Sequence, residues 1–333
     1  MTYEEFKDLL MEQLIKKSEW GISEDNVRFY NKGFSSPDNE KEQEFIMDTN
    51  IRYYKTESDV LISDFITVTI KDSGENIKHQ CRFGLQELYE GFGDKGWEFV
   101  WKTVKDNLDL GKQVFETGVL SMVNDYQAVK ERLVIRPINY TDHKYDLREA
   151  VYRQTGDIAL VLYLIIYENN EKGLGTTKIH KGTFGEWQKS IDEVWEAALT
   201  NTYVLAPPRM YMTPFDRVDP PYERGAFMAL GSKMKSFGKL SMPSVTTVKQ
   251  VNGAIAMFYP GVKEKIASMA GGSYYVAFTS IHEAEIHCIN TVPPKTILKN
   301  IKEVNKAFGP EETLTRKVYF YDAEKRTFNA LGL

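Results

Sequence analysis

The sequence predicts an α+β protein, in which helices pack on a largely antiparallel or mixed β-sheet and an N-terminal α/β region precedes it. Three observations indicate this class. The chain has no internal repeat, and its strand and helix patterns lack the regular βαβα alternation of a parallel fold. Its hydrophobic content of 42% is sufficient for a substantial core. Two strand pairs near the C-terminus, 274–278 with 284–289 and 316–321 with 327–331, are each joined by a short connection.

The first 131 residues are expected to form the N-terminal α/β region. Apolar side chains at helical spacing predict a helix over residues 3–17. Strand-like patterns occur at 26–31, 51–54 and 60–70. A further helix is predicted over 85–108, although it contains the glycine-rich stretch GFGDKG at 91–96. Because this stretch lacks the GxGxxG order and a preceding hydrophobic strand, we interpret it as a helix break and not as a phosphate-binding loop.

Residues 132–333 are expected to form a second, C-terminal α+β domain. Its further strands are predicted at 132–139, 157–167, 176–182 and 254–259. Its helices are predicted at 186–199, 262–269 and 297–308. Trp187 and Trp195 are eight residues apart in the first of these helices, which predicts that both face the core.

A proline-rich insertion spans residues 206–243 of the second domain. It holds six prolines and five methionines, and no helical or strand periodicity continues for long. We therefore expect it neither to join the sheet nor to supply much core. One interpretation is a mobile surface insertion. The other is a docking loop for a protein partner, with adaptable and partly exposed side chains. The residues expected to bind the partner are Arg209, Met210, Tyr211, Met212, Phe215 and Tyr222.

The stretch 278–288 gathers most of the residues that could perform chemistry. His282 and His287 are five residues apart, so they do not match the metalloprotease motif, which places two histidines four apart on one helix face. Alternation predicts instead a half-buried strand whose core face carries Ala284, Ile286 and Cys288. The opposite face would carry Glu283, Glu285 and His287. These three residues are candidate metal ligands, and the alternative is that they form a solvated polar strand face.

Ser280, His282 and Glu283 are candidate catalytic residues of a hydrolytic site, with Ser280 as the nucleophile. No GxSxG elbow surrounds the serine, and its neighbours carry no oxyanion-hole signal. The alternative is that Ser280 and His282 form hydrogen bonds at a turn or sheet end, which would hold the strand pair in register.

Charge and cysteine content narrow the class of protein. A net charge of −5 and a pI near 5.7 give no general drive toward nucleic acid, whose non-specific binding depends on clustered Lys and Arg. Two cysteines are too few for a disulfide framework. The N-terminus lacks the basic start and apolar run of a secretory signal. The longest apolar run, 158–167, has ten residues, whereas a membrane span needs about 20. We therefore expect a cytoplasmic protein without membrane attachment.

Several sequence pieces follow one another in a characteristic order and spacing. They are LVIRPINY (133–140), DIALVLYLII (157–166), AALTNT (197–202), NGAIAMFYPGVKEKIA (252–267), SIHEAEI (280–286), IKEVNKAFGPEETL (301–314) and KVYFYD (317–322). Over residues 132–331 the chain thereby resembles an uncharacterised bacterial family, a domain of unknown function common in gut Firmicutes and often found in mobile-element contexts. The resemblance implies a fold and a class, and it supplies no chemistry.

Two functional hypotheses follow. The first is a cytoplasmic accessory protein, encoded by a mobile element, which binds a protein partner and has neither catalytic activity nor a cofactor. The alternative is a metal-assisted hydrolase centred on the strand at 280–288.

Overall fold

The computed structural model describes residues 1–16, 22–30, 54–55, 60–61, 64–71, 78–144, 147–169, 173–212, 225–228, 236, 242–309 and 311–333. The chain groups into two compact units, residues 1–122 and 123–333. Both units combine helices with antiparallel strands, which confirms the α+β class. The expected domain boundary between residues 131 and 132 stays a prediction.

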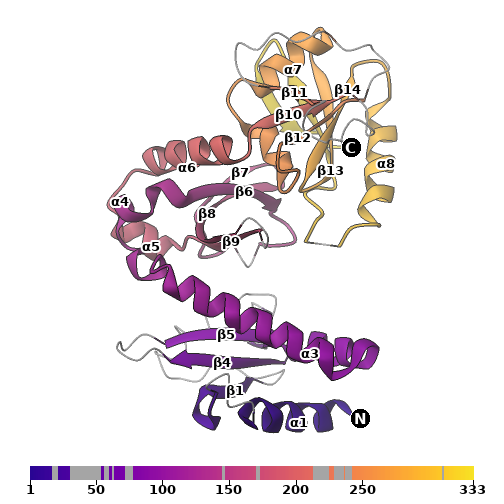
Figure 1. The fold of residues 1–333 in the computed structure, drawn as a ribbon. Coiled ribbons are helices and arrows are strands. Elements are labelled where there is room, and N and C mark those ends of the chain that lie inside the picture. The colour runs from indigo at the N-terminus through magenta and orange to yellow at the C-terminus, as the bar shows by residue number, and fades with distance from the viewer. Residues whose placement is uncertain are drawn as a thin grey trace. The chain divides into compact units, whose positions relative to one another are not determined.

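The first unit packs helices on a small antiparallel sheet of order β1-β4-β5 (Figure 1). Its main elements are α1 (Tyr3–Lys16), β1 (Val27–Tyr30), β4 (Phe65–Lys71), β5 (Lys78–Gly84) and α3 (Leu85–Glu116). Its short elements are η2 (Glu24–Asn26), β2 (Tyr54–Lys55), β3 (Val60–Leu61) and η4 (Leu120–Met122). Phe6, Leu10 and Leu14 recur every four residues, so one face of α1 enters the core. Gly96 has a φ of 69° within α3, which confirms the predicted helix break.

One sheet of the second unit is built on a long central strand. Its strands are β6 (Leu133–Asn139), β7 (Tyr152–Thr155), β8 (Ile158–Asn169) and β9 (Gly173–Lys178). β8 pairs with β6 along one edge, and with β7 and then β9 along the other. Helix α6 (Ile191–Leu205) lies along this sheet (Figure 1), and Ser190 caps its N-terminus, since the Ser190 hydroxyl accepts the Glu193 N–H. The neighbouring helices are α4 (Tyr126–Val129), η5 (Lys130–Arg132) and α5 (Lys181–Glu186).

Side chains of α6 cap the outer edge of β6. The hydroxyl of Thr202 accepts the Ile135 N–H at 2.8 Å, and the amide of Asn201 donates to the Leu133 carbonyl at 3.0 Å. Pro137 is two residues farther along the same edge and has no N–H to offer. An edge strand with unpaired backbone groups would accept another strand, so this capping closes β6 to further pairing.

Within the described residues, the other sheet of the second unit has seven strands in the order β11-β10-β12-β14-β13-β15-β16, and all neighbours are antiparallel. They are β10 (Pro208–Tyr211), β11 (Ala226–Phe227), β12 (Ser244–Thr247), β13 (Tyr274–Ser280), β14 (Glu283–Cys288), β15 (Val318–Asp322) and β16 (Thr327–Ala330). Helix α8 (Pro294–Asn305) packs on the face that carries Ala277, while η7 (Gly253–Phe258) and α7 (Val262–Ala270) lie on the face of Phe278.

Some elements differ from their sequence-based predictions. The strand expected at 254–259 is wrong, because these residues form the buried 3-10 helix η7; an apolar run buried on all sides has no periodicity that separates strand from helix. The helix expected at 186–199 begins at Ile191 instead. Trp187 follows α5, and Gln188 has a φ of 49°, so Trp187 and Trp195 belong to different elements.

Part of the proline-rich insertion joins the sheet, against expectation. β10 pairs with both β11 and β12, and Pro208 is its first residue, where a missing N–H is tolerated. Met210 and Tyr211 have no solvent-exposed surface, so the expectation that they are partly exposed is wrong. The periodicity was hidden because this strand has only four residues.

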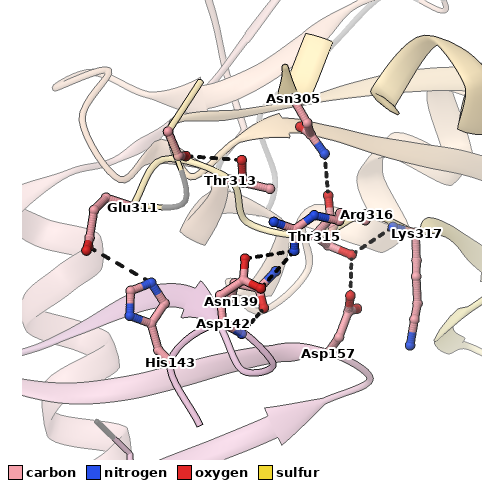
Figure 2. A network of polar contacts seen from close by, with 11 residues as sticks. Asn139, Asp142, His143, Asp157, Asn305, Glu311, Thr313, Thr315, Arg316 and Lys317 are labelled. Carbon is pink, nitrogen blue, oxygen red and sulfur yellow. Dashed lines mark hydrogen bonds and ion pairs between the residues drawn. The ribbon is translucent and has the colours of Figure 1, made fainter. Parts of the chain in front are cut away.

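The turn between β7 and β8 joins one sheet of the second unit to the other (Figure 2). The buried carboxylate of Asp157 accepts a hydrogen bond from the Thr315 hydroxyl at 2.8 Å, as Figure 2 shows. It accepts a second one from the Tyr319 hydroxyl, also at 2.8 Å. Burial, and then the charge of Asp157, raise the pKa of Tyr319, so this hydroxyl keeps the proton that it donates. Gly156 has a φ of 61°, and a Cβ there would lie 2.5 Å from the Tyr319 oxygen. The close approach of the two sheets therefore requires glycine at this position.

Further polar contacts surround this junction (Figure 2). Arg316 forms an ion pair with Asp142 at 2.7 Å. The amide of Asn305 donates to the carbonyl of Thr315 at 3.1 Å, which fixes the segment before β15 against α8.

Removing the Tyr319 hydroxyl should destabilise the second unit. In Tyr319→Phe, the Asp157 carboxylate keeps Thr315 as its one side-chain donor among the described residues, and a buried charge that loses a hydrogen bond costs about 1–3 kcal/mol. Urea unfolding measures the loss. Tyr275→Phe, in neighbouring β13, is the matched control, because no described residue hydrogen-bonds its hydroxyl, and it should change stability by less than about 0.5 kcal/mol. Equal effects of the two variants would contradict the role given to Tyr319.

Candidate ligand-binding site

Ser280, His282 and Glu283 come together at the tight turn between β13 and β14. The Ser280 hydroxyl accepts the backbone N–H of His282 at 3.0 Å. The His282 ring is engaged elsewhere: Nδ1 accepts the Asn252 N–H at 3.0 Å, and Nε2 lies 3.8 Å from the carboxylate of Glu312. Ser280 and His282 thus make turn hydrogen bonds and do not form the nucleophile–base pair of a hydrolase.

Glu283 is held by hydroxyl groups on both sides. One carboxylate oxygen accepts from Ser244 of β12 at 2.9 Å, and the other accepts from Thr279 of β13 at 3.0 Å. These bonds tie β14 to both of its neighbouring strands. Each carboxylate oxygen of Glu283 thus accepts one hydrogen bond from a neighbouring strand.

His287 is buried, so the expectation of a solvated polar strand face fails at this position. Only 5% of its surface is exposed, and its Nε2 lies 3.8 Å from a carboxylate oxygen of Glu285. Burial lowers the pKa of His287, because a charged ring would lose its hydration. Neither of its ring nitrogens has a hydrogen-bond partner among the described residues. Throughout the described residues, no three His, Cys, Asp or Glu side chains are arranged to hold a metal ion.

The β13–β14 turn instead positions the loop of residues 248–252 and the start of η7. The Thr246 hydroxyl donates to the His282 carbonyl at 2.7 Å, and the Ala254 N–H donates to the Ile281 carbonyl at 3.1 Å. Gly253 permits this contact, because a Cβ there would lie 2.0 Å from the Thr246 oxygen and 2.5 Å from the His282 oxygen. Together with the bond from Asn252 to His282, these contacts hold the loop and η7 against the turn.

A cavity of about 340 Å³ lies where this loop faces the other sheet of the unit. Its lining comes from β6, from the β8–β9 hairpin, from the end of α6, and from the loop with η7. The lining residues are Val134, Ile135, Arg136, Glu168, Leu174, Thr202, Leu205, Ala206, Lys249, Val251, Asn252 and Ile255. The volume falls within the range of about 300–1,000 Å³ that is typical of small-molecule sites, and most of these side chains are apolar.

The residues expected to bind a protein partner do not form a described surface. Arg209 lies over the Phe227 ring at 5.1 Å and donates to the Gly225 carbonyl at 3.4 Å. Met212 is 37% exposed. Phe215 and Tyr222 lie outside the described residues.

Sequence reasoning missed the cavity. Its lining residues are separated by more than one hundred positions along the chain, so no local pattern unites them. One signal was visible, since Arg136 interrupts the apolar strand sequence LVIRPIN. A cation in a strand that is otherwise mostly buried indicates either an ion pair or a ligand.

The fold and the site define an α+β protein with a largely apolar cavity, in which Ser280, His282 and Glu283 form hydrogen bonds within the β13–β14 turn and to its neighbours. A model of a family of unknown function, DUF5688, matches residues 58–323, and the chain belongs to this family. No curated protein and no solved structure gives a significant match. Among the helices in the described ranges, none is long and apolar enough to cross a membrane.

Acid should destabilise the protein through His287. Its folded-state pKa lies below the value of about 6.5 expected in the unfolded chain, so the unfolded state binds more protons once the pH falls below that value. Stability is therefore lost as the pH falls through about 6.5 toward the folded-state pKa, by about 1.4 kcal/mol per unit of pKa difference.

Urea unfolding between pH 7.5 and 5 measures this dependence. His287→Leu replaces an orphaned buried ring with an apolar side chain and should flatten the acid slope. His143→Leu is the control, since its ring lies 4.0 Å from the Glu311 carboxylate, and it should not flatten the slope in the same way. An unchanged slope in His287→Leu would refute this assignment.

Proposed function

We propose that this protein acts by binding a small apolar ligand in the cavity between β6, α6 and the loop of residues 248–252, and that it is not an enzyme. The proposal is supported by the contacts of the candidate catalytic residues. Ser280, His282 and Glu283 form hydrogen bonds within the β13–β14 turn and to the neighbouring segments, and this turn supports one wall of the cavity.

The apolar lining supports a ligand with an apolar body. Val134, Leu205 and Val251 contribute branched side chains from three separate elements. Val251 is 59% exposed, so a ligand would cover apolar surface that now faces water. Burial of such surface stabilises a complex by about 25 cal/mol per Å² before the costs of association are subtracted.

We also propose, from the sequence, that the protein is cytoplasmic and is encoded by a mobile element. Neither Cys81 nor Cys288 forms a disulfide, which suits a reducing cytoplasm. The resemblance to mobile-element proteins of gut Firmicutes supports the same origin for this chain. A protein partner at residues 206–243 remains a hypothesis, with less support now that Met210 and Tyr211 lie in the sheet.

Filling the cavity should abolish the binding of a neutral apolar probe. Octanol, titrated into methyl-labelled protein and followed by NMR, should shift the methyl signals of Val134, Leu205 and Val251 saturably. Val251→Trp places an indole at the cavity and should remove this response. Val204→Trp is the control, because Val204 is 73% exposed on α6 and does not line the cavity.

Thermal melting should show that both variants fold. Saturable shifts that persist in Val251→Trp, or an absence of saturable shifts in the unmodified protein, would overturn the proposal.

A further inference from the structure

Arg136 is a half-buried cation that has no carboxylate counter-ion among the described residues. Its guanidinium lies 5.3 Å from the centre of the Tyr163 ring, and burial lowers its pKa. No carboxylate among the described residues forms an ion pair with it. A desolvated charge is costly unless it is paired, so this guanidinium is suited to an anion from outside the chain.

Arg153 shows the usual arrangement in the same sheet. It also stacks on an aromatic ring, that of Trp195, at 4.8 Å. Unlike Arg136, it forms an ion pair with the carboxylate of Asp192. Both arginines stack on an aromatic ring, and Arg136 differs from Arg153 in having no carboxylate partner among the described residues.

The remaining charges of the lining also favour an anion. Lys249 adds a second positive charge from the loop, and Glu168 is the acidic member of the lining. Glu168 and Lys249 are both exposed, so water screens both of their charges, whereas the guanidinium of Arg136 is partly withdrawn from water. The cavity therefore offers an excess of positive charge beside an apolar wall.

We infer that the ligand is a compact apolar carboxylate whose head binds the guanidinium of Arg136 and whose body lies against Val134, Leu205 and Val251. This inference rests on the proposed function and names its ligand class. A planar guanidinium offers parallel N–H donors that match the two oxygens of a carboxylate.

A compact molecule fits this site better than an extended peptide. Peptides that bind beside a strand commonly add to the free edge of a sheet. On β6 that edge is closed, because Thr202 and Asn201 already bond Ile135 and Leu133, and Pro137 has no N–H. The ligand must therefore be recognised by its head and its apolar body.

Isothermal titration of the full chain with octanoate, octanol and octylamine separates these features. We expect octanoate to bind at least about tenfold more tightly than octanol, since a charge-assisted hydrogen bond is worth that factor or more. Octylamine should bind most weakly. Arg136→Gln should erase the preference of octanoate over octanol, while Arg153→Gln, the matched control, should keep it. Octyl phosphate tests whether the head group is instead a phosphate.

Each outcome decides a separate point. If octanol and octanoate bind equally, the carboxylate inference is overturned and the proposed function stands; if none of the octyl compounds binds, the proposed function fails as well. Tightest binding of octylamine or octyl phosphate would also overturn the inference, as would tight binding of a capped valine–threonine pentapeptide. Circular dichroism checks the fold of Arg136→Gln. If this variant does not fold, Arg136→Lys keeps the charge without the paired donors and should lose part of the preference.

Discussion

The buried carboxylate of Asp157 is the constraint on which the second unit depends. A buried carboxylate needs hydrogen-bond donors, and here the donors are the hydroxyls of Tyr319 and Thr315. Tyr319 lies in β15 of the seven-stranded sheet, and Thr315 lies in the segment just before β15. Asp157 therefore fixes where one sheet meets the other. The cavity depends on this placement, because β6 and α6 supply one wall and the loop of residues 248–252 with η7 supplies another.

A second constraint shapes the cavity wall itself. The turn between β13 and β14 holds Asn252, Gly253 and Ala254 through hydrogen bonds and close backbone contact. Histidine, serine and glutamate in one short segment resemble a catalytic set, yet buried turns and sheet ends need the same groups to satisfy backbone donors and hydroxyls. The hydrogen bonds of Ser280, His282 and Glu283 become visible only in the folded structure, because sequence alone does not show which groups they contact.

Local sequence patterns predicted the elements whose two faces lie in different surroundings. The pairing of β13 with β14, and of β15 with β16, followed from alternation and short turns. Prediction failed where tertiary contacts determine the conformation or the burial of a residue. The helix η7 is buried on all sides, and β10 is a short strand that begins at a proline. His287 is buried although Glu285, on the same face of β14, is partly exposed. The cavity could not be predicted for the same reason, because its lining residues come from segments that are far apart in the chain.

We propose that the cavity beside Arg136 holds an apolar carboxylate. Isotope-filtered NMR on the complex with carbon-13-labelled octanoate tests it most directly, because nuclear Overhauser effects report contacts between ligand and protein methyl groups. We expect contacts from the octanoate chain to Val134, Leu205 and Val251, with the carboxylate end nearest the side chain of Arg136. Contacts confined to other surfaces, such as the exposed Val204 on α6, or an orientation that points the methyl end at Arg136, would contradict it.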